Sequence, residues 1–182
     1  FMEFWTWDNE SLALISEHIK TKESLPQDLL QSLLNARFFQ SGMQTLRQIE
    51  FALFDLSIHK AAPALNAKQV QATLNDIRQK FSVLPTVPYN RFQNSFSHIF
   101  AGGYAAGYYS YKWAEVLASD AFDRFENEGI FNTETGKEFR LAILAVGGKD
   151  TALDAFVRFR GREPKIDALL RHQGWTNPTK SA

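Results

Sequence analysis

Apolar residues recur every three or four positions along most of the chain, which is the spacing of one face of an α-helix. The clearest case is the stretch 41–59, for which the spacing predicts one long helix. Its apolar face would consist of Met43, Leu46, Ile49, Leu53 and Leu56. Further helices are predicted over 8–20, 26–34, 67–81, 104–126, 133–146, 151–159 and 165–172. No segment shows sustained alternation of apolar and polar residues, so we predict an all-α fold of roughly eight helices and no sheet.

Capping residues and helix breakers mark the ends of these predicted helices. Asn66 suits an N-cap, and Gly161 suits the end of a helix. The stretch 82–88 contains two prolines and is predicted to be a loop. We expect residues 1–175 to form one irregular helical domain and residues 176–182 to form a polar, frayed tail.

The length and composition are those of one globular domain with a substantial core. The chain has 182 residues, of which 45% are hydrophobic and 22% are charged. Because 20 basic residues balance 20 acidic residues, nucleic acid or an anionic membrane is not expected as the main partner. The chain has no run of 18 apolar residues, so no membrane-spanning helix is expected. It has no cysteine, which excludes disulfides and thiolate metal sites and fits a reducing compartment.

The chain begins with an unusually apolar segment. Phe1, Met2, Phe4 and Trp5 fall within its first five residues, and position 1 is not an initiator methionine. We interpret this start as a piece cut from a longer protein, whose first residues packed on a part that is absent. Apolar patches above a few hundred Å² usually find a partner. We therefore expect self-association through these four side chains and through a surface that includes Tyr104.

What the sequence lacks argues against several kinds of catalytic site. The four histidines are His18, His59, His98 and His172, and no two of them are four residues apart. That spacing would place two imidazoles on one helix face for a zinc ion, so no complete zinc site is expected among these residues. No Gly-x-Ser-x-Gly motif marks a nucleophilic serine, and no glycine-rich loop carries the lysine and hydroxyl that bind phosphate.

The densest polar aromatic cluster follows Gly102 and Gly103. Four of eight consecutive residues there are tyrosine. On a helix, Tyr104, Tyr108 and Tyr111 would share one face. A row of phenols is suited to donate hydrogen bonds to a peptide carbonyl or to a developing oxyanion. The alternative is that the rings only pack a core, although buried phenols need hydrogen-bond partners that phenylalanine would not need.

A second cluster, Arg160-Gly161-Arg162-Glu163, is charged. Its two guanidinium groups are suited to bind the carboxylate of a ligand. The other interpretation, which we favour, is a helix that ends at the glycine and is supported by local ion pairs. The sequence alone leaves both interpretations open.

Five stretches together carry a family resemblance. They are 98–113 (HIFAGGYAAGYYSYKW), 46–55 (LRQIEFALFD), 129–132 (GIFN), 159–164 (FRGREP) and 1–5 (FMEFW). In these motifs and in their order, the chain resembles the thimet oligopeptidase and oligopeptidase A family of zinc metallopeptidases, in particular its bacterial oligopeptidase A branch. The resemblance covers essentially residues 1–172.

The resemblance implies roles for residues of the first of these stretches. It implies that Tyr104 and Tyr111 are catalytic and hydrogen-bond the substrate and the tetrahedral oxyanion. Further substrate-binding residues would be His98, Gly102, Gly103 and Tyr108. The face argument from the residues alone selects the same three tyrosines.

The resemblance also implies a zincin-like, mostly helical catalytic domain that hydrolyses short oligopeptides in the cytoplasm with zinc as cofactor. The zinc ligands and the general-base glutamate of the family would all precede Phe1, so this chain would be the C-terminal part of that domain. We therefore expect it to bind no zinc and to cleave no peptide by itself. The alternative function is a non-catalytic helical module that holds a peptide or a partner helix in its aromatic groove.

Overall fold

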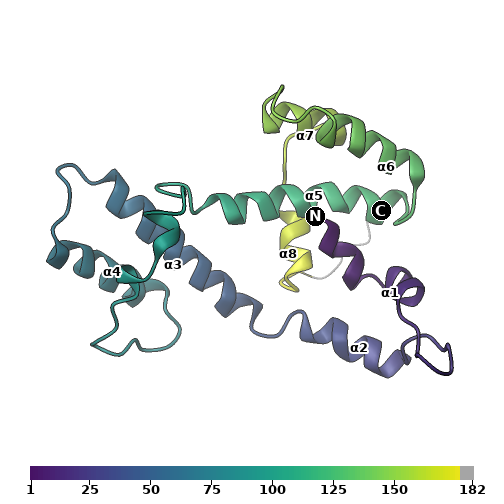
Figure 1. Cartoon of the computed structure of the whole chain (residues 1–182), viewed down its shortest axis with the longest axis horizontal. Coiled ribbons are helices and arrows are strands. Elements are labelled where there is room, and N and C mark those ends of the chain that lie inside the picture. Colours follow the sequence, from purple (N-terminus) through teal and green to yellow (C-terminus); the bar gives the residue numbers. More distant parts are fainter. Residues whose placement is uncertain (177–182) are drawn as a thin grey trace. The chain divides into compact units, whose positions relative to one another are not determined.

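The computed structural model describes residues 1–176, in which helices are joined by turns and loops (Figure 1). Over that range there are eight α-helices and no strand. The predicted all-α fold of roughly eight helices is therefore confirmed. Residues 177–182, which make up nearly all of the predicted polar tail, lie outside the described residues.

Most of the predicted helices are present with small changes at their ends. The α-helices are α1 (Asn9–Ile15), α2 (Gln27–Ala36), α3 (Ser41–Lys60), α4 (Ala67–Phe81), α5 (Ser110–Glu128), α6 (Thr133–Phe139), α7 (Ala152–Arg160) and α8 (Asp167–His172). Three short 3-10 helices are η1 (Met2–Trp7), η2 (Phe92–Asn94) and η3 (Ser97–Ile99). A π-helical segment, η4 (Arg140–Leu144), continues α6.

Helix α1 is shorter than the sequence predicts. It begins after Asp8, whose side chain accepts a hydrogen bond from a backbone N–H of the first turn at 2.9 Å. It ends at Ile15 because the chain then turns. The N–H of His18 donates to the carbonyl of Glu23, which closes that turn and draws the following residues away from the helix axis.

The chain divides into two compact units, each with its own hydrophobic core. The first unit consists of Phe1–Phe39 and the chain from Ala114 onward, and the second consists of Gln40–Trp113. The assignment of residues 1–175 to one domain stays a prediction.

Phenylalanine rings fill the core of the first unit. Its buried members are Ala121, Phe122, Phe125, Ala142, Phe156 and Phe159. The ring of Phe122 lies 4.8 Å from those of both Phe4 and Trp5. Phe1, Phe4 and Trp5 are only partly exposed, because their rings pack on this core. Met2 is exposed, and self-association stays a prediction.

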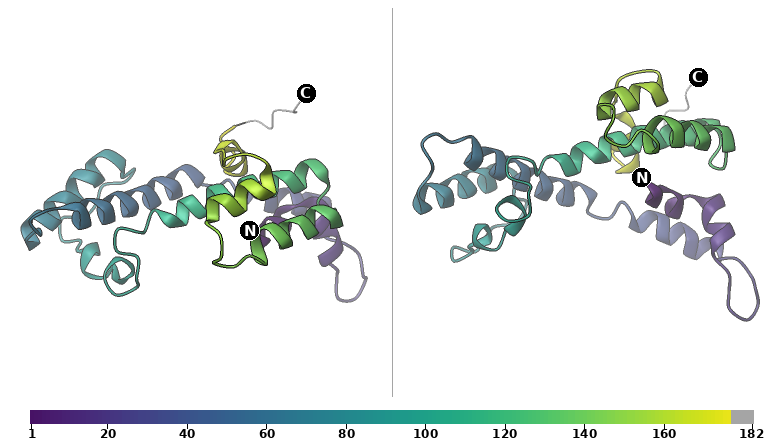
Figure 2. Two further views of the ribbon diagram at one scale, coloured as in Figure 1. Left: turned by 90° about the horizontal axis from the view of Figure 1, so that it is seen from above. Right: turned by 45° about the horizontal axis from the view of Figure 1, so that its top comes forward.

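The second unit is built on α3 and α4, which lie side by side (Figures 1 and 2). Its buried core consists of Phe54, Leu74, Ile77, Phe96 and Ile99. The predicted apolar face of α3 is only partly correct, because Leu56 is exposed while the carboxylates of Glu50 and Asp55 are buried. Glu50 accepts hydrogen bonds from Arg47 at 2.7 Å and from Arg78 at 2.8 Å. These charged partners satisfy a carboxylate that burial alone would penalise.

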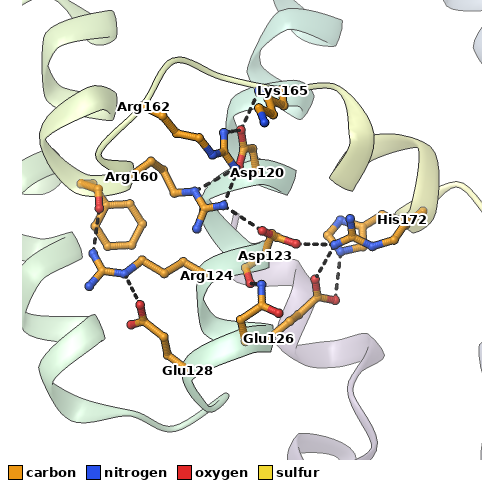
Figure 3. A network of polar contacts seen from close by, with 12 residues as sticks. Asp120, Asp123, Arg124, Glu126, Glu128, Arg160, Arg162, Lys165 and His172 are labelled. Atoms are coloured by element: carbon orange, nitrogen blue, oxygen red, sulfur yellow. Dashed lines mark hydrogen bonds and ion pairs between the residues drawn. The ribbon is translucent and has the colours of Figure 1, made fainter. Parts of the chain in front are cut away.

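A charged network joins α5 to the C-terminal segments of the first unit (Figure 3). Asp120 is 1% exposed and accepts hydrogen bonds from Arg160 Nε at 3.0 Å and from both Nη atoms of Arg162 at 2.6 Å. The backbone N–H of Lys165 adds another bond at 2.7 Å. Gly161, at φ +71°, ends α7 as predicted. The arginine cluster therefore caps a helix and forms ion pairs within the chain, although its partners lie on α5 rather than nearby in sequence.

Candidate active site

The tyrosine loop, which we define as residues 102–109, lies between η3 and α5 in the second unit. The sequence predicts a helix from Tyr104, and this prediction is wrong for the loop, because α5 begins at Ser110. Instead, the N–H of Gly107 donates to the carbonyl of Tyr104 at 2.8 Å, which is the spacing of a turn.

A buried carboxylate explains why the loop is not helical. In an α-helix, the N–H of Tyr108 would donate to the carbonyl four residues earlier. Here it donates to Oδ2 of Asp55 at 2.9 Å, and the N–H of Ala106 donates to Oδ1 of the same side chain at 2.9 Å. Ala106 has φ +55°, a left-handed conformation that costs a residue other than glycine about 1–2 kcal/mol. The two bonds to Asp55 offset this cost and hold the loop in its turns.

The predicted site residues come together although the helix is absent. The ring of Tyr111 lies 5.0 Å from that of Tyr104 and 5.0 Å from that of Tyr108. The imidazole of His98 lies 6.4 Å from the ring of Tyr104 and 6.3 Å from that of Tyr108. The four side chains therefore form one aromatic cluster. The grouping of the three tyrosines is correct, and the helical reason given for it is wrong.

Each tyrosine of the cluster carries a hydroxyl group that can donate one hydrogen bond. The hydroxyl of Tyr108 donates to Oε1 of Gln48 at 3.0 Å, and burial raises the pKa of Tyr108 above its ordinary value. A hydrogen bond with Tyr104 raises the pKa of Tyr111 above its ordinary value. Tyr104 is 36% exposed and Tyr111 is 39% exposed, so both can reach a ligand.

Gly102 and Gly103 are required for different reasons. A Cβ at Gly102 would lie 2.8 Å from the carbonyl oxygen and 2.9 Å from the Cα of His98, which is closer than such atoms approach. Gly103 has φ +80°, which favours glycine, and the space around it is open. Gly102 therefore lets the loop pass close to the backbone of His98.

Comparison with known proteins shows which family this chain belongs to. The family model of peptidase family M3 matches residues 1–175. The chain belongs to peptidase family M3. It is 52% identical over 177 residues to an oligopeptidase A of Haemophilus influenzae and 52% identical over 174 residues to one of Escherichia coli. It is 48% identical over 178 residues to a protein of Arabidopsis thaliana named "Probable cytosolic oligopeptidase A".

These alignments cover most of this M3 chain and a small part of each relative. They include 97%, 96% and 96% of this chain, but 26%, 26% and 25% of the respective relatives. The chain therefore spans about a quarter of the length of the curated relatives it matches. Membership in a peptidase family favours the enzymatic interpretation over the helical binding module.

Two residues support the cluster in this M3 chain although no sequence motif singles them out. Asp55 is fully buried and holds the backbone of the tyrosine loop, and Gln48 accepts from Tyr108. Both lie on α3, between the apolar positions whose spacing predicts that helix. The available signal was a carboxylate at the end of the apolar run 51–54, since a charged residue at such a position needs partners if it is buried.

The described residues of this M3 chain do not fit a zinc site. Within residues 1–176, no group of three or more His, Asp or Glu side chains lies close enough to hold a metal ion. Two of the histidines have carboxylate neighbours: His59 Nδ1 lies 2.8 Å from Asp55 Oδ1, and His172 Nε2 lies 3.0 Å from Glu126 Oε1.

Within residues 1–176, no helix combines the length and the apolar character needed to cross a membrane.

The Gly102→Ala variant is expected to destabilise the second unit by roughly 1–3 kcal/mol. The added methyl group would meet the backbone of His98, which cannot turn away as a flexible side chain can. Thermal unfolding of the variant measures this loss. Gly42→Ala is the matched control, because a Cβ there, on α3, meets nothing within 4 Å and alanine favours a helix. A Gly102→Ala variant as stable as Gly42→Ala would contradict the close approach.

Proposed function

We propose that this chain supplies the substrate-binding and oxyanion-stabilising tyrosines of a zinc-dependent oligopeptidase. The observation that carries the proposal is the aromatic cluster of Tyr104, Tyr108, Tyr111 and His98 in a chain of peptidase family M3. The names of the curated relatives, which are oligopeptidases, support peptides as the substrate class.

The cluster offers the chemistry that peptide hydrolysis needs on the side of the developing charge. When the scissile carbonyl becomes tetrahedral, its oxygen gains negative charge, and a donor aimed at that oxygen stabilises the transition state more than the ground state. Tyr104 and Tyr111 are partly exposed and each carries a hydroxyl group that can donate a hydrogen bond, so we assign them this role. We assign substrate binding to His98 and Tyr108 and to the glycines at 102 and 103.

Zinc belongs to the full-length protein in this proposal. The described residues of this chain do not form a site for it. The family resemblance implies that the zinc ligands and the general base would precede Phe1. The tyrosine cluster would therefore act together with groups that this chain does not supply. We also propose a cytoplasmic location, which the name of the cytosolic Arabidopsis relative supports.

The experiment that tests this function uses the full-length protein and a series of short, internally quenched peptides. We expect hydrolysis of unstructured peptides, loss of hydrolysis after treatment with a zinc chelator, and recovery after zinc is restored. A folded protein that contains the same scissile sequence is the control substrate. A full-length protein that binds these peptides without cleaving them would support the helical binding module instead.

A further inference from the structure

Asp55 is the most completely satisfied buried carboxylate near the candidate site. It lies on α3, has no exposed surface, and is separated by about fifty residues of sequence from the loop it contacts. Oδ1 accepts from the N–H of Ala106 at 2.9 Å and lies 2.8 Å from Nδ1 of His59. Oδ2 accepts from the N–H of Tyr108 at 2.9 Å. Three donors from two elements therefore converge on one side chain.

The donor from His59 can be assigned from its neighbours. Its Nδ1 lies 2.8 Å from the Asp55 carboxylate and 3.0 Å from the Asp55 backbone carbonyl, and both oxygens are acceptors. Nδ1 must then carry a hydrogen, so His59 donates to Asp55. This bond leaves the remaining acceptor positions of the carboxylate for the two N–H groups of the tyrosine loop.

The carboxylate and the loop depend on each other. A buried carboxylate without donors is strongly unfavourable, so Asp55 requires the N–H groups of the loop. The loop in turn requires an acceptor. Because it is not helical, the N–H groups of Ala106 and Tyr108 do not donate to backbone carbonyls as they would in a helix, and they donate to Asp55 instead. These two bonds fix the backbone on either side of Gly107, between the rings of Tyr104 and Tyr108.

We propose that Asp55 is a positioning residue for the tyrosine cluster. It sets the path of the loop from α3 and so fixes where the rings of Tyr104 and Tyr108 lie relative to Tyr111, which is carried by the first turn of α5. This inference rests on the proposed function, because the consequence for catalysis follows only if the tyrosines contact the substrate. The placement of the loop itself does not depend on that function.

A carboxylate is required at this position, and an amide of the same shape does not replace it. Asparagine offers one oxygen and one NH2 group. If its oxygen faces Ala106 and His59, its NH2 group faces the N–H of Tyr108; if it is turned over, its NH2 group faces Ala106 and His59 instead. In either orientation, a buried donor faces another donor and at least one bond to the loop is lost.

The test compares Asp55→Asn with Glu50→Gln in the full-length protein. Glu50 is the matched control, because it is also a buried carboxylate of α3 but is paired with Arg47 and Arg78 rather than with the loop. Hydrogen exchange of the peptides that cover residues 104–109 reports on the loop, and kcat and KM for a short peptide report on the site. We expect Asp55→Asn to speed exchange in the loop by about tenfold or more and to lower kcat by about 10- to 100-fold with a smaller change in KM. Glu50→Gln should change neither measurement by more than about twofold.

The outcomes separate this inference from the proposed function. Unchanged loop exchange in a folded Asp55→Asn variant would overturn the inference, whatever the turnover. Wild-type kcat in Asp55→Asn while Tyr111→Phe is impaired would also overturn it. Wild-type kcat in Tyr111→Phe would instead overturn the proposed function, and loop exchange alone would then decide the role of Asp55. If Asp55→Asn does not fold, His59→Leu replaces it: about threefold faster loop exchange supports the inference, and unchanged exchange contradicts it.

Discussion

Replacing Tyr111 with phenylalanine is expected to lower kcat of the full-length protein by roughly 100-fold or more, with little change in folding stability. The substitution keeps the ring of residue 111, whose centre lies 5.0 Å from the ring centres of both Tyr104 and Tyr108. It removes only the hydroxyl, which is the group that can donate a hydrogen bond to the substrate oxygen. Steady-state kinetics on a short peptide, together with the melting temperature, measure the two effects separately.

Two further tyrosine variants complete this test. Tyr104→Phe should behave like Tyr111→Phe, with a larger effect on KM because Tyr104 follows the two glycines that shape the loop. Tyr109→Phe should be nearly neutral, because the aromatic cluster of the described residues consists of Tyr104, Tyr108, Tyr111 and His98 and does not include Tyr109. If Tyr109→Phe impairs turnover as much as Tyr111→Phe, the assignment of the cluster is wrong. If Tyr104→Phe and Tyr111→Phe lose melting temperature but keep turnover, the rings only pack a core.

The long helices of the second unit could be predicted from sequence because their signals are local. Helix α4 begins at a capping box in which the side chains of Asn66 and Gln69 each accept the backbone N–H of the other. Helix α3 has twenty residues and an apolar pattern, and it ends where Pro63 follows. Capping and periodicity act within a few residues, so a single sequence contains them in full.

The tyrosine loop could not be predicted because the deciding interaction is distant. The residues from Tyr104 to Ser110 include alanines and follow a helical spacing, so local preference favours a helix. The acceptor that overrides this preference is Asp55, about fifty residues earlier in the chain. No local pattern indicates that pairing. The three tyrosines were nevertheless grouped correctly, because the turns bring their rings together by another path.

The packing partners of the N-terminal residues also could not be predicted from sequence, because they lie far along the chain. A run of apolar side chains shows that a surface must be covered, but it does not show which surface covers it. Phe1 stacks on Phe139 at 4.2 Å, and Trp5 Nε1 donates to the carbonyl of Ile130 at 3.1 Å. These partners lie far along the chain. The sequence therefore shows that these side chains are apolar, but it does not show that Phe1, Phe4 and Trp5 pack on the core of their own unit.

The partners of the charged residues Arg160 and Arg162 are likewise distant in sequence. Local ion pairs were expected around Arg160 and Arg162, and the pairs exist, but they reach α5 (Figure 3). Two residues of α8 reach the same helix: Arg171 donates to Asp123 of α5, and His172 lies 3.0 Å from Glu126 of α5. The network thus ties the end of the described chain to the helix that carries the core of the first unit, and Asp120 is its most buried member.

The Asp120→Asn variant is expected to lose about 3–5 kcal/mol of unfolding free energy at neutral pH, because it leaves Arg160 and Arg162 without their shared carboxylate in a buried position. Burial opposes ionisation of Asp120, but the hydrogen bonds from Arg162 and the N–H of Lys165 and the charges of both arginines outweigh it, so the pKa of Asp120 lies below its ordinary value. The carboxylate therefore stabilises the fold fully above the ordinary pKa of an aspartate, about 3.9, and this contribution is lost as the pH falls through the lower folded-state pKa.

Urea unfolding of the wild type and of Asp120→Asn at pH 7, at pH 5 and near pH 3 measures this dependence. The difference in unfolding free energy should be nearly equal at the two higher pH values and should shrink at the lowest, because the wild-type carboxylate then begins to take up a proton and loses its advantage over the amide. Asp28→Asn is the control, since Asp28 is an exposed residue in the first turn of α2 and its loss should cost less than about 1 kcal/mol. A difference that stays constant down to pH 3 would mean that the amide disturbs the packing around α5 and that the charge of Asp120 contributes little.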